Sequence, residues 1–111
     1  MIEIIVKDYL ENELGVPVVL ERQDDMENYI LIEKTSSSEE NYISFCTFAI
    51  QSYSKSLYEA ALLNERVKEA MRNIIQLNSI SKSKLNSDYN FTDATKKQYR
   101  YQAVYDLVFF E

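Results

Sequence analysis

The stretch that decides the fold is residues 41–77, NYISFCTFAIQSYSKSLYEAALLNERVKEAMRNIIQL. Its first part predicts a long strand, because apolar side chains recur on two alternating faces as far as residue 53. One face carries Cys46, Phe48 and Ile50, and the opposite face carries Ile43, Phe45, Thr47, Ala49, Gln51 and Tyr53. Since both faces hold apolar side chains, the pattern is typical of a strand in the middle of a sheet with both sides covered.

Two interpretations of the second face stay open. In the first, the strand lies between helices of the same molecule, and both of its faces belong to one core. In the second, the face that bears Phe45, Thr47, Gln51 and Tyr53 contacts a neighbouring subunit. These four residues are therefore the first candidate interface residues.

A long amphipathic helix follows the strand. Ser56 and Glu59 have the spacing of a capping box, in which each side chain bonds a backbone N–H at the start of a helix. Helical spacing then places on one side Leu57, Ala60, Ala61, Val67, Ala70, Met71, Ile74 and Ile75. We expect Phe48 and Ile50 to pack against this side of the helix.

The remaining elements are shorter. Apolar spacing predicts a first helix that ends at Gly15, and alternation predicts strands at residues 16–20, 29–35, 80–85 and 99–108. Polar composition predicts loops at residues 21–27, 35–41 and 86–97. The expected order is α-β-β-β-α-β-β within a single domain, residues 1–111. This order favours an α+β fold, with an antiparallel or mixed sheet packed by two helices.

The amino-acid composition does not indicate a catalytic or cofactor-binding site. The chain has 111 residues, with no histidine, one cysteine and one glycine. Nucleophilic catalysis needs a base beside the nucleophile, phosphate loops need several glycines, and one cysteine forms neither an internal disulfide nor a metal cluster. We therefore expect a protein that is not an enzyme, with no catalytic, cofactor-binding or metal-ligating residue. No apolar run approaches the ~18 residues of a membrane span, so we expect no membrane contact.

Charge is unevenly distributed along the chain. Residues 1–45 hold eleven acidic and three basic side chains, a balance of −8, and the remainder holds seven acidic and nine basic, a balance of +2. An acidic and a mildly basic surface on one domain suit head-to-tail association of identical copies, while simple solubility is the plain alternative. A net charge of −6 does not favour gripping nucleic acid, which needs clustered lysine and arginine.

Three segments carry a resemblance to a known family. They are residues 49–61 (AIQSYSKSLYEAA), residues 85–90 (LNSDYN) and residues 99–106 (YRYQAVYD). With the order and length of the elements, they resemble the tail-terminator, or tail-to-head joining, proteins of phages and prophages with long non-contractile tails. The likeness spans almost the whole chain.

The resemblance implies a structural role in virion assembly. Proteins of this family form a hexameric ring that caps the finished tail tube and joins it to the neck of the head. The implied partners are further copies of the chain, a tail tube protein and a head-tail connector or neck protein. DNA passes through the ring without specific binding, no cofactor is needed, and the protein is found in the host cell cytoplasm during assembly and then in the virion tail.

Loops on a rigid body commonly carry recognition, so we expect the loops at residues 35–41 and 86–97 to reach the tube or the neck. Within the second loop, Tyr89 and Phe91 complete the set of candidate interface residues, because exposed aromatic side chains anchor interfaces. Two alternatives remain: another phage neck or minor capsid protein, or a monomeric acidic phage-encoded inhibitor that binds a host protein.

Overall fold

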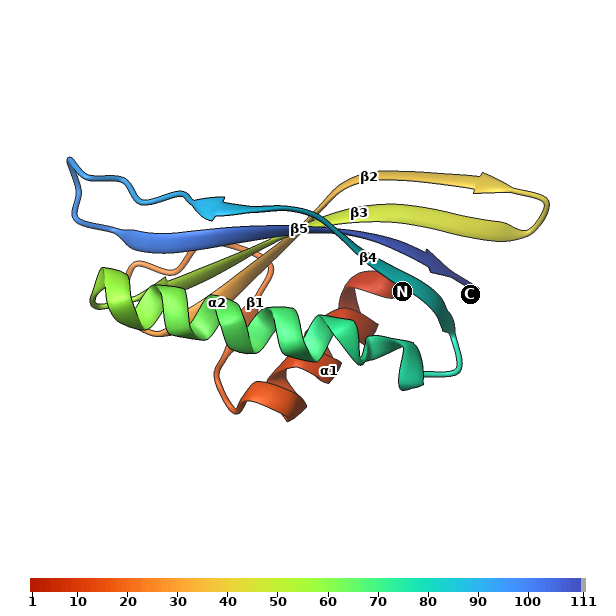
Figure 1. Cartoon of the computed structure of the whole chain (residues 1–111), viewed down its shortest axis with the longest axis horizontal. Coiled ribbons are helices and arrows are strands. Elements are labelled where there is room, and N and C mark those ends of the chain that lie inside the picture. Colours follow the sequence, from red (N-terminus) through yellow and green to blue (C-terminus); the bar gives the residue numbers. More distant parts are fainter. Residues whose placement is uncertain (111) are drawn as a thin grey trace.

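A computed structural model, which describes residues 1–110, has one five-stranded sheet with both α-helices on the same face (Figure 1). The elements in chain order are α1 (Ile2–Leu14), β1 (Val18–Val19), β2 (Tyr29–Glu40), β3 (Ile43–Ser54), α2 (Leu57–Arg72), the 3-10 turn η1 (Ile74–Gln76), β4 (Ile80–Asn90) and β5 (Tyr99–Phe109). The sheet order is β1-β2-β3-β5-β4. Only β1 pairs in parallel, and the other neighbours are antiparallel. The predicted α+β class, element order and mixed sheet are confirmed.

The predicted cap of α2 forms in half, since the Glu59 side chain accepts from the Ser56 hydroxyl at 3.4 Å and not from the Ser56 N–H, and the predicted end of α1 at Gly15 is confirmed. The Ser56 hydroxyl accepts a hydrogen bond of 3.1 Å from the Glu59 backbone N–H, which satisfies one of the free donors at the start of α2. Gly15 ends α1 with φ of 68°, in the left-handed region that glycine adopts without a steric cost, and its N–H donates to the Glu11 carbonyl. The start of α2 and the end of α1 therefore lie where the sequence predicts them, whereas α2 ends at Arg72, before the last residues of its predicted apolar side.

The core lies between the helices and one face of the sheet. Phe48 and Ile50 are fully buried there, as expected, together with Val67 and Met71 of α2. The predicted burial of Leu57 is wrong, because its side chain is 42% exposed in the first turn of α2. Ile75 is also exposed. Leu63 and Asn64 are buried in their place, because α2 turns a slightly different side to the sheet.

The loop predicted at residues 35–41 is mostly strand. β2 continues to Glu40, and only Asn41 and Tyr42 form the turn, with positive φ at both positions. Positive φ at both positions is the conformation of a type I′ hairpin turn, whose twist matches that of the flanking strands. Pairing with residues 43–47 of β3 thus overrides the low strand propensity of the serines and glutamates.

The loop predicted at residues 86–97 is also shorter than expected. β4 continues to Asn90, and a register shift between Leu85 and Ser87 lets it follow β5. Such a bulge increases the local twist of a strand. Conversely, the strand predicted at residues 16–20 is reduced to Val18 and Val19, because Pro17 has no N–H to donate to a ladder.

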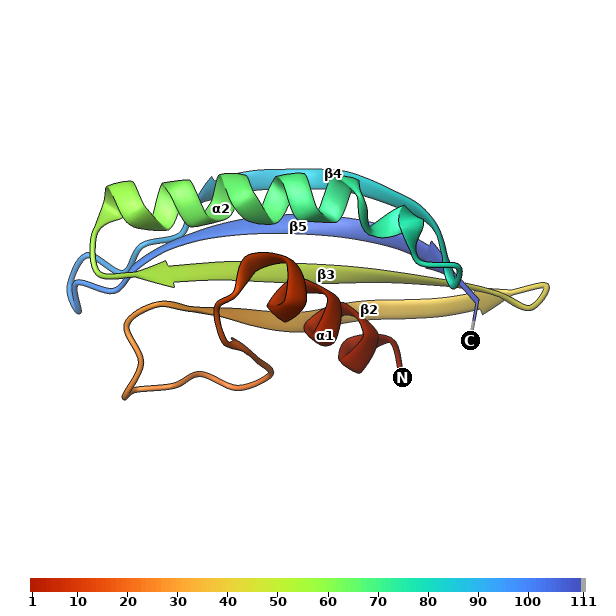
Figure 2. The same cartoon turned by 90° about the horizontal axis from the view of Figure 1, so that it is seen from below.

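The molecule is elongated, with principal extents of 45, 24 and 21 Å. The β2–β3 turn projects beyond the helices at one end of the long axis, and the β4–β5 connection projects at the opposite end (Figures 1 and 2). No helix within residues 1–110 is long and apolar enough to cross a membrane.

Candidate functional site

The face of the sheet opposite the helices carries every candidate interface residue. The prediction that β3 lies between helices is wrong, since α1 and α2 both pack on the other face (Figure 2). We call the uncovered side the open face; it includes Phe45, Thr47, Gln51 and Tyr53 of β3, their neighbours Arg100, Gln102 and Asp106 of β5, and Tyr89 and Phe91 at the end of β4. With no helix of residues 1–110 on the open face, the second interpretation, in which this face contacts a neighbouring subunit, stays open.

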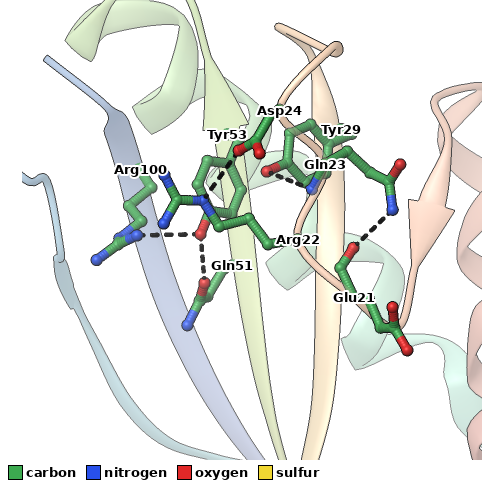
Figure 3. Close-up of polar contacts among 8 residues, drawn as sticks. All are labelled: Glu21, Arg22, Gln23, Asp24, Tyr29, Gln51, Tyr53 and Arg100. Atoms are coloured by element: carbon green, nitrogen blue, oxygen red, sulfur yellow. Dashed lines mark hydrogen bonds and ion pairs between the residues drawn. The ribbon is translucent and has the colours of Figure 1, made fainter. Parts of the chain in front are cut away.

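Five side chains of the open face form one chain of hydrogen bonds across three strands. The Arg100 guanidinium donates to the Tyr53 hydroxyl at 3.0 Å, which donates to the Gln51 side-chain oxygen at 2.9 Å. The Gln51 amide donates to the Gln102 oxygen at 2.8 Å, and the Gln102 amide donates to the Tyr89 hydroxyl. Figure 3 shows the first three of these side chains.

The direction of this chain is fixed at its first member. A guanidinium only donates hydrogen bonds, so the Tyr53 hydroxyl accepts one from Arg100 and donates its own to the side-chain oxygen of Gln51. The amides of Gln51 and Gln102 continue in the same sense. Tyr89 is the last acceptor, which leaves its hydroxyl proton to donate outside the chain. The Tyr89 side chain as a whole is 41% exposed.

Aromatic contacts surround the residues at the two ends of this series of hydrogen bonds. The rings of Tyr29 and Tyr53 stack at a centroid distance of 4.5 Å, and Tyr89 meets Phe91 edge to face at 5.9 Å. The Arg100 guanidinium lies 4.5 Å from the centre of the Phe91 ring, a cation–π contact. Of the predicted residues here, Tyr53 is buried under these contacts, whereas Tyr89 and Phe91 remain accessible.

Thr47 belongs to a second polar group nearer the β2–β3 turn. The Thr47 hydroxyl and the Asn86 amide donate to the two oxygens of Asp106, at 2.7 and 3.0 Å. The hydrogen bond from Asn86, followed by the one from Thr47, holds the pKa of Asp106 below its usual value. Phe45 lies further along β3 and is 38% exposed. The structure thus brings Gln51, Tyr53, Tyr89 and Phe91 together and leaves Phe45 and Thr47 apart from them.

The acidic loop at residues 21–27 packs at the end of the open face next to Tyr29. The Gln23 backbone N–H donates to the Tyr29 hydroxyl at 3.4 Å, and Arg22 pairs loosely with Asp24 at 3.8 Å (Figure 3). Burial raises the pKa of Tyr29. Two of the three contacts, Gln23 with Glu21 and Arg22 with Asp24, lie within the loop, and the contact with Tyr29 joins the loop to the start of β2.

Sequence reasoning missed Arg100 and Gln102, which connect the predicted residues. Gln102 is only 8% exposed, and both of its side-chain groups are bonded. The available signal was the alternation of β5, where Arg100, Gln102 and Asp106 share one side while the opposite side holds Ala103, Tyr105 and Leu107. Three polar side chains on one side of a central strand indicate a bonded polar surface.

A surface hollow of about 440 Å³ lies away from the open face, between α1 and α2. Its lining residues include Glu13, Leu62, Arg66 and Glu69. Within residues 1–110, no three His, Cys, Asp or Glu side chains gather in a group that could hold a metal ion. We therefore take the hydrogen-bonded side chains of the open face as the candidate site.

Comparison with known proteins identifies no family for this chain. No protein-family model matches the chain, and a search of curated proteins finds no significant relative.

Proposed function

We propose that this chain is a structural protein of phage or prophage assembly, which forms a ring on the end of the tail tube and joins the tail to the neck of the head. The observation that carries the proposal is the position of the two projecting turns. They lie at opposite ends of a body 45 Å long, with a face free of helices between them. A junction protein needs two separate contact ends of this kind, one for each partner.

The composition of the two ends supports contact with different partners. The β2–β3 end carries Glu39, Glu40 and an almost fully exposed Tyr42, whereas the β4–β5 end carries Lys96, Lys97 and Phe91. The β2–β3 turn is thus acidic, whereas the β4–β5 turn presents two lysines next to acidic side chains, Asp93 of the same turn and Asp24 and Glu27 of the neighbouring loop. Charge complementarity of this kind selects partners and the orientation in which they bind.

The open face supports assembly from copies of the same chain. Its exposed anchors are Phe45, Tyr89 and Phe91, and aromatic side chains of this type are enriched at the centres of protein interfaces. The hydrogen-bond chain behind Tyr89 holds that side chain in place before a partner arrives, which lowers the entropic cost of association. In the ring, DNA passes without specific contacts, in keeping with a net charge of −6.

A gene disruption tests this proposal. In the phage or prophage that encodes the chain, loss of the gene should leave separate heads and tails whose tubes exceed the normal length, as seen by negative-stain electron microscopy. Wild-type protein supplied from a plasmid should restore joined particles. Joined virions of normal tail length without the gene would contradict the proposal, and normal tails with unfinished heads would indicate a head protein.

Two variants test the role of the lysines in the β4–β5 turn. Lys96→Glu together with Lys97→Glu reverses the charge of the β4–β5 turn, which lies outside the core. Arg72→Glu, at an exposed position in the last turn of α2, is the control for a change of charge elsewhere. We expect the turn variant to fail in restoring joined particles and the control to succeed. Equal success of the two variants would remove the turn from the proposed contact.

A further inference from the structure

Two long strand edges of the sheet have no neighbour within the described chain. β4 lies at one end of the sheet order, so its outer edge of 11 residues is unpaired. At the other end, β1 pairs only with Ile30 and Leu31, which leaves β2 from residue 32 to residue 40 unpaired on its outer side. Unpaired edges present rows of free N–H and C=O groups and are templates for pairing with another strand.

The two edges carry opposite charge. On the β4 edge, Lys82 and Lys84 are exposed and form no ion pair with another residue of the described chain. On the β2 edge, Glu33, Glu39 and Glu40 are likewise exposed and unpaired. The remaining charged residues of these edges, Lys34 and Asp88, already pair with Glu3 and Lys68. Lys84 lies across from Asp106 of β5 and helps to stabilise its charge, so the uncompensated basic charge of the β4 edge is Lys82, while the β2 edge keeps its three glutamates.

The register places these charges at similar levels along the strands. Reading across the sheet, Lys82 is level with Val108, then Phe45, then Ser38 of β2. Glu40 is therefore two residues further along β2 than the level of Lys82. Lys82 and Glu40 also point to the same side, because their partners Val108 and Ile43 both belong to the open face. A stagger of two residues between adjacent copies would bring Lys82 and Glu40 directly opposite each other.

We propose that the β4 edge of one copy pairs with the β2 edge of the next copy, which extends the sheet continuously from subunit to subunit. β2 and β4 run in opposite directions within the sheet, because the three pairings that connect them, β2–β3, β3–β5 and β5–β4, are all antiparallel. Two copies placed side by side in the same orientation therefore meet as an antiparallel pair. This inference rests on the proposed ring, in which the β4 and β2 edges would be the contacts between adjacent subunits.

The charges also exclude the symmetric alternatives. Pairing of β4 with β4 would bring lysines together, and pairing of β2 with β2 would bring glutamates together, and like charges opposite each other destabilise a strand pair. Association is then head-to-tail, which generates a closed ring where the rotation permits. A plainer interpretation is that the edge lysines only protect a monomer from aggregation, as edge lysines commonly do.

Two charge-reversed variants distinguish these interpretations by native mass spectrometry and sedimentation velocity. The first, Lys82→Glu with Lys84→Glu, makes both edges acidic, and the second, Glu39→Lys with Glu40→Lys, makes both edges basic. Each variant alone should associate at least about tenfold more weakly than the wild-type chain. An equimolar mixture should recover oligomers in which the two variants alternate. That recovery also shows that both variants are folded.

Variants with equal changes of net charge away from the edges serve as controls. Arg22→Glu with Lys55→Glu matches the first variant, and Asp24→Lys with Asp25→Lys matches the second; all four positions are exposed. Both controls should assemble as the wild-type chain does. Rings that survive either edge reversal, or that are lost equally in the controls, would overturn the edge pairing while the ring itself stands. A mixture that fails to recover would also overturn it, and a wild-type chain that stays monomeric would overturn both the pairing and the ring.

Discussion

Gln51 of β3 donates its side-chain amide to the side-chain oxygen of Gln102 on β5 at 2.8 Å, on the face of the sheet that no helix covers. Gln102 is nearly buried although it lies on this face. A buried amide is costly unless its groups are bonded, and here both are. The open face is thus an ordered polar surface, and we attribute its order to a role in binding.

Truncation of Phe48 tests the core. The Phe48 ring is fully buried between the sheet and α2, so Phe48→Ala should lower the free energy of unfolding by about 3–5 kcal/mol. Phe45→Ala, on the open face of the same strand, is the control and should cost about 1 kcal/mol or less. Urea denaturation of both variants gives the two values. Equal losses would place Phe48 and Phe45 in equivalent surroundings and contradict the described orientation of β3.

Removal of the cap tests the start of α2. Ser56→Ala deletes the hydroxyl that accepts from the Glu59 N–H, and we expect a loss of about 1 kcal/mol in the free energy of unfolding. Ser38→Ala, at an exposed position of β2 without a side-chain hydrogen bond in the described chain, should change it by less than about 0.5 kcal/mol. Thermal unfolding followed by circular dichroism compares the two. A stability unchanged by Ser56→Ala would show that the cap contributes nothing.

A buried polar contact under β4 gives a third prediction. Asn64 is 2% exposed, and its amide donates to Asp88 at 2.6 Å, while Lys68 donates to the other oxygen of Asp88. Asp88→Ala leaves the Asn64 amide buried without an acceptor, so we expect a loss of about 1–3 kcal/mol.

Asp8→Ala, on the exposed side of α1, is the control for this change and should have little effect on urea denaturation. If Asp88→Ala were as mild as its control, the contact with Asn64 would not contribute to stability.

The pKa of Asp106 gives a prediction with a defined pH dependence. Its folded-state pKa lies below the ordinary value of an aspartate, about 3.9. The stability that its ionised form contributes is therefore complete above about pH 4, and it is lost as the pH falls through the lower folded-state value. Asn86→Ala removes the first of the two hydrogen bonds and should raise the pKa of Asp106.

Titration of the Asp106 carboxyl carbon by NMR measures this shift. Ser87→Ala, which alters the next residue of β4 and not a partner of Asp106, should leave the titration unchanged. An Asp106 titration that is the same in Asn86→Ala and in the wild-type chain would show that this hydrogen bond does not set the pKa.

The sequence predicted the elements with strong periodic patterns and the side of the sheet on which the candidate residues lie. Cys46, Phe48 and Ile50 face the helices, and Phe45, Thr47 and Gln51 face away from them. Strand ends were predicted less well, because residues 36–40 and 86–90 are polar and become strands only by pairing with partners distant in the sequence. The coverage of the second face was also unpredictable, since it depends on where both helices pack.

The central claim is that copies of this chain form a closed ring. Its most direct test is the native mass of the purified wild-type chain over a concentration series, with negative-stain images of the same samples. The account predicts a ring of about six copies that forms as the concentration rises. A monomer at every concentration, with no ring in the images, would contradict it.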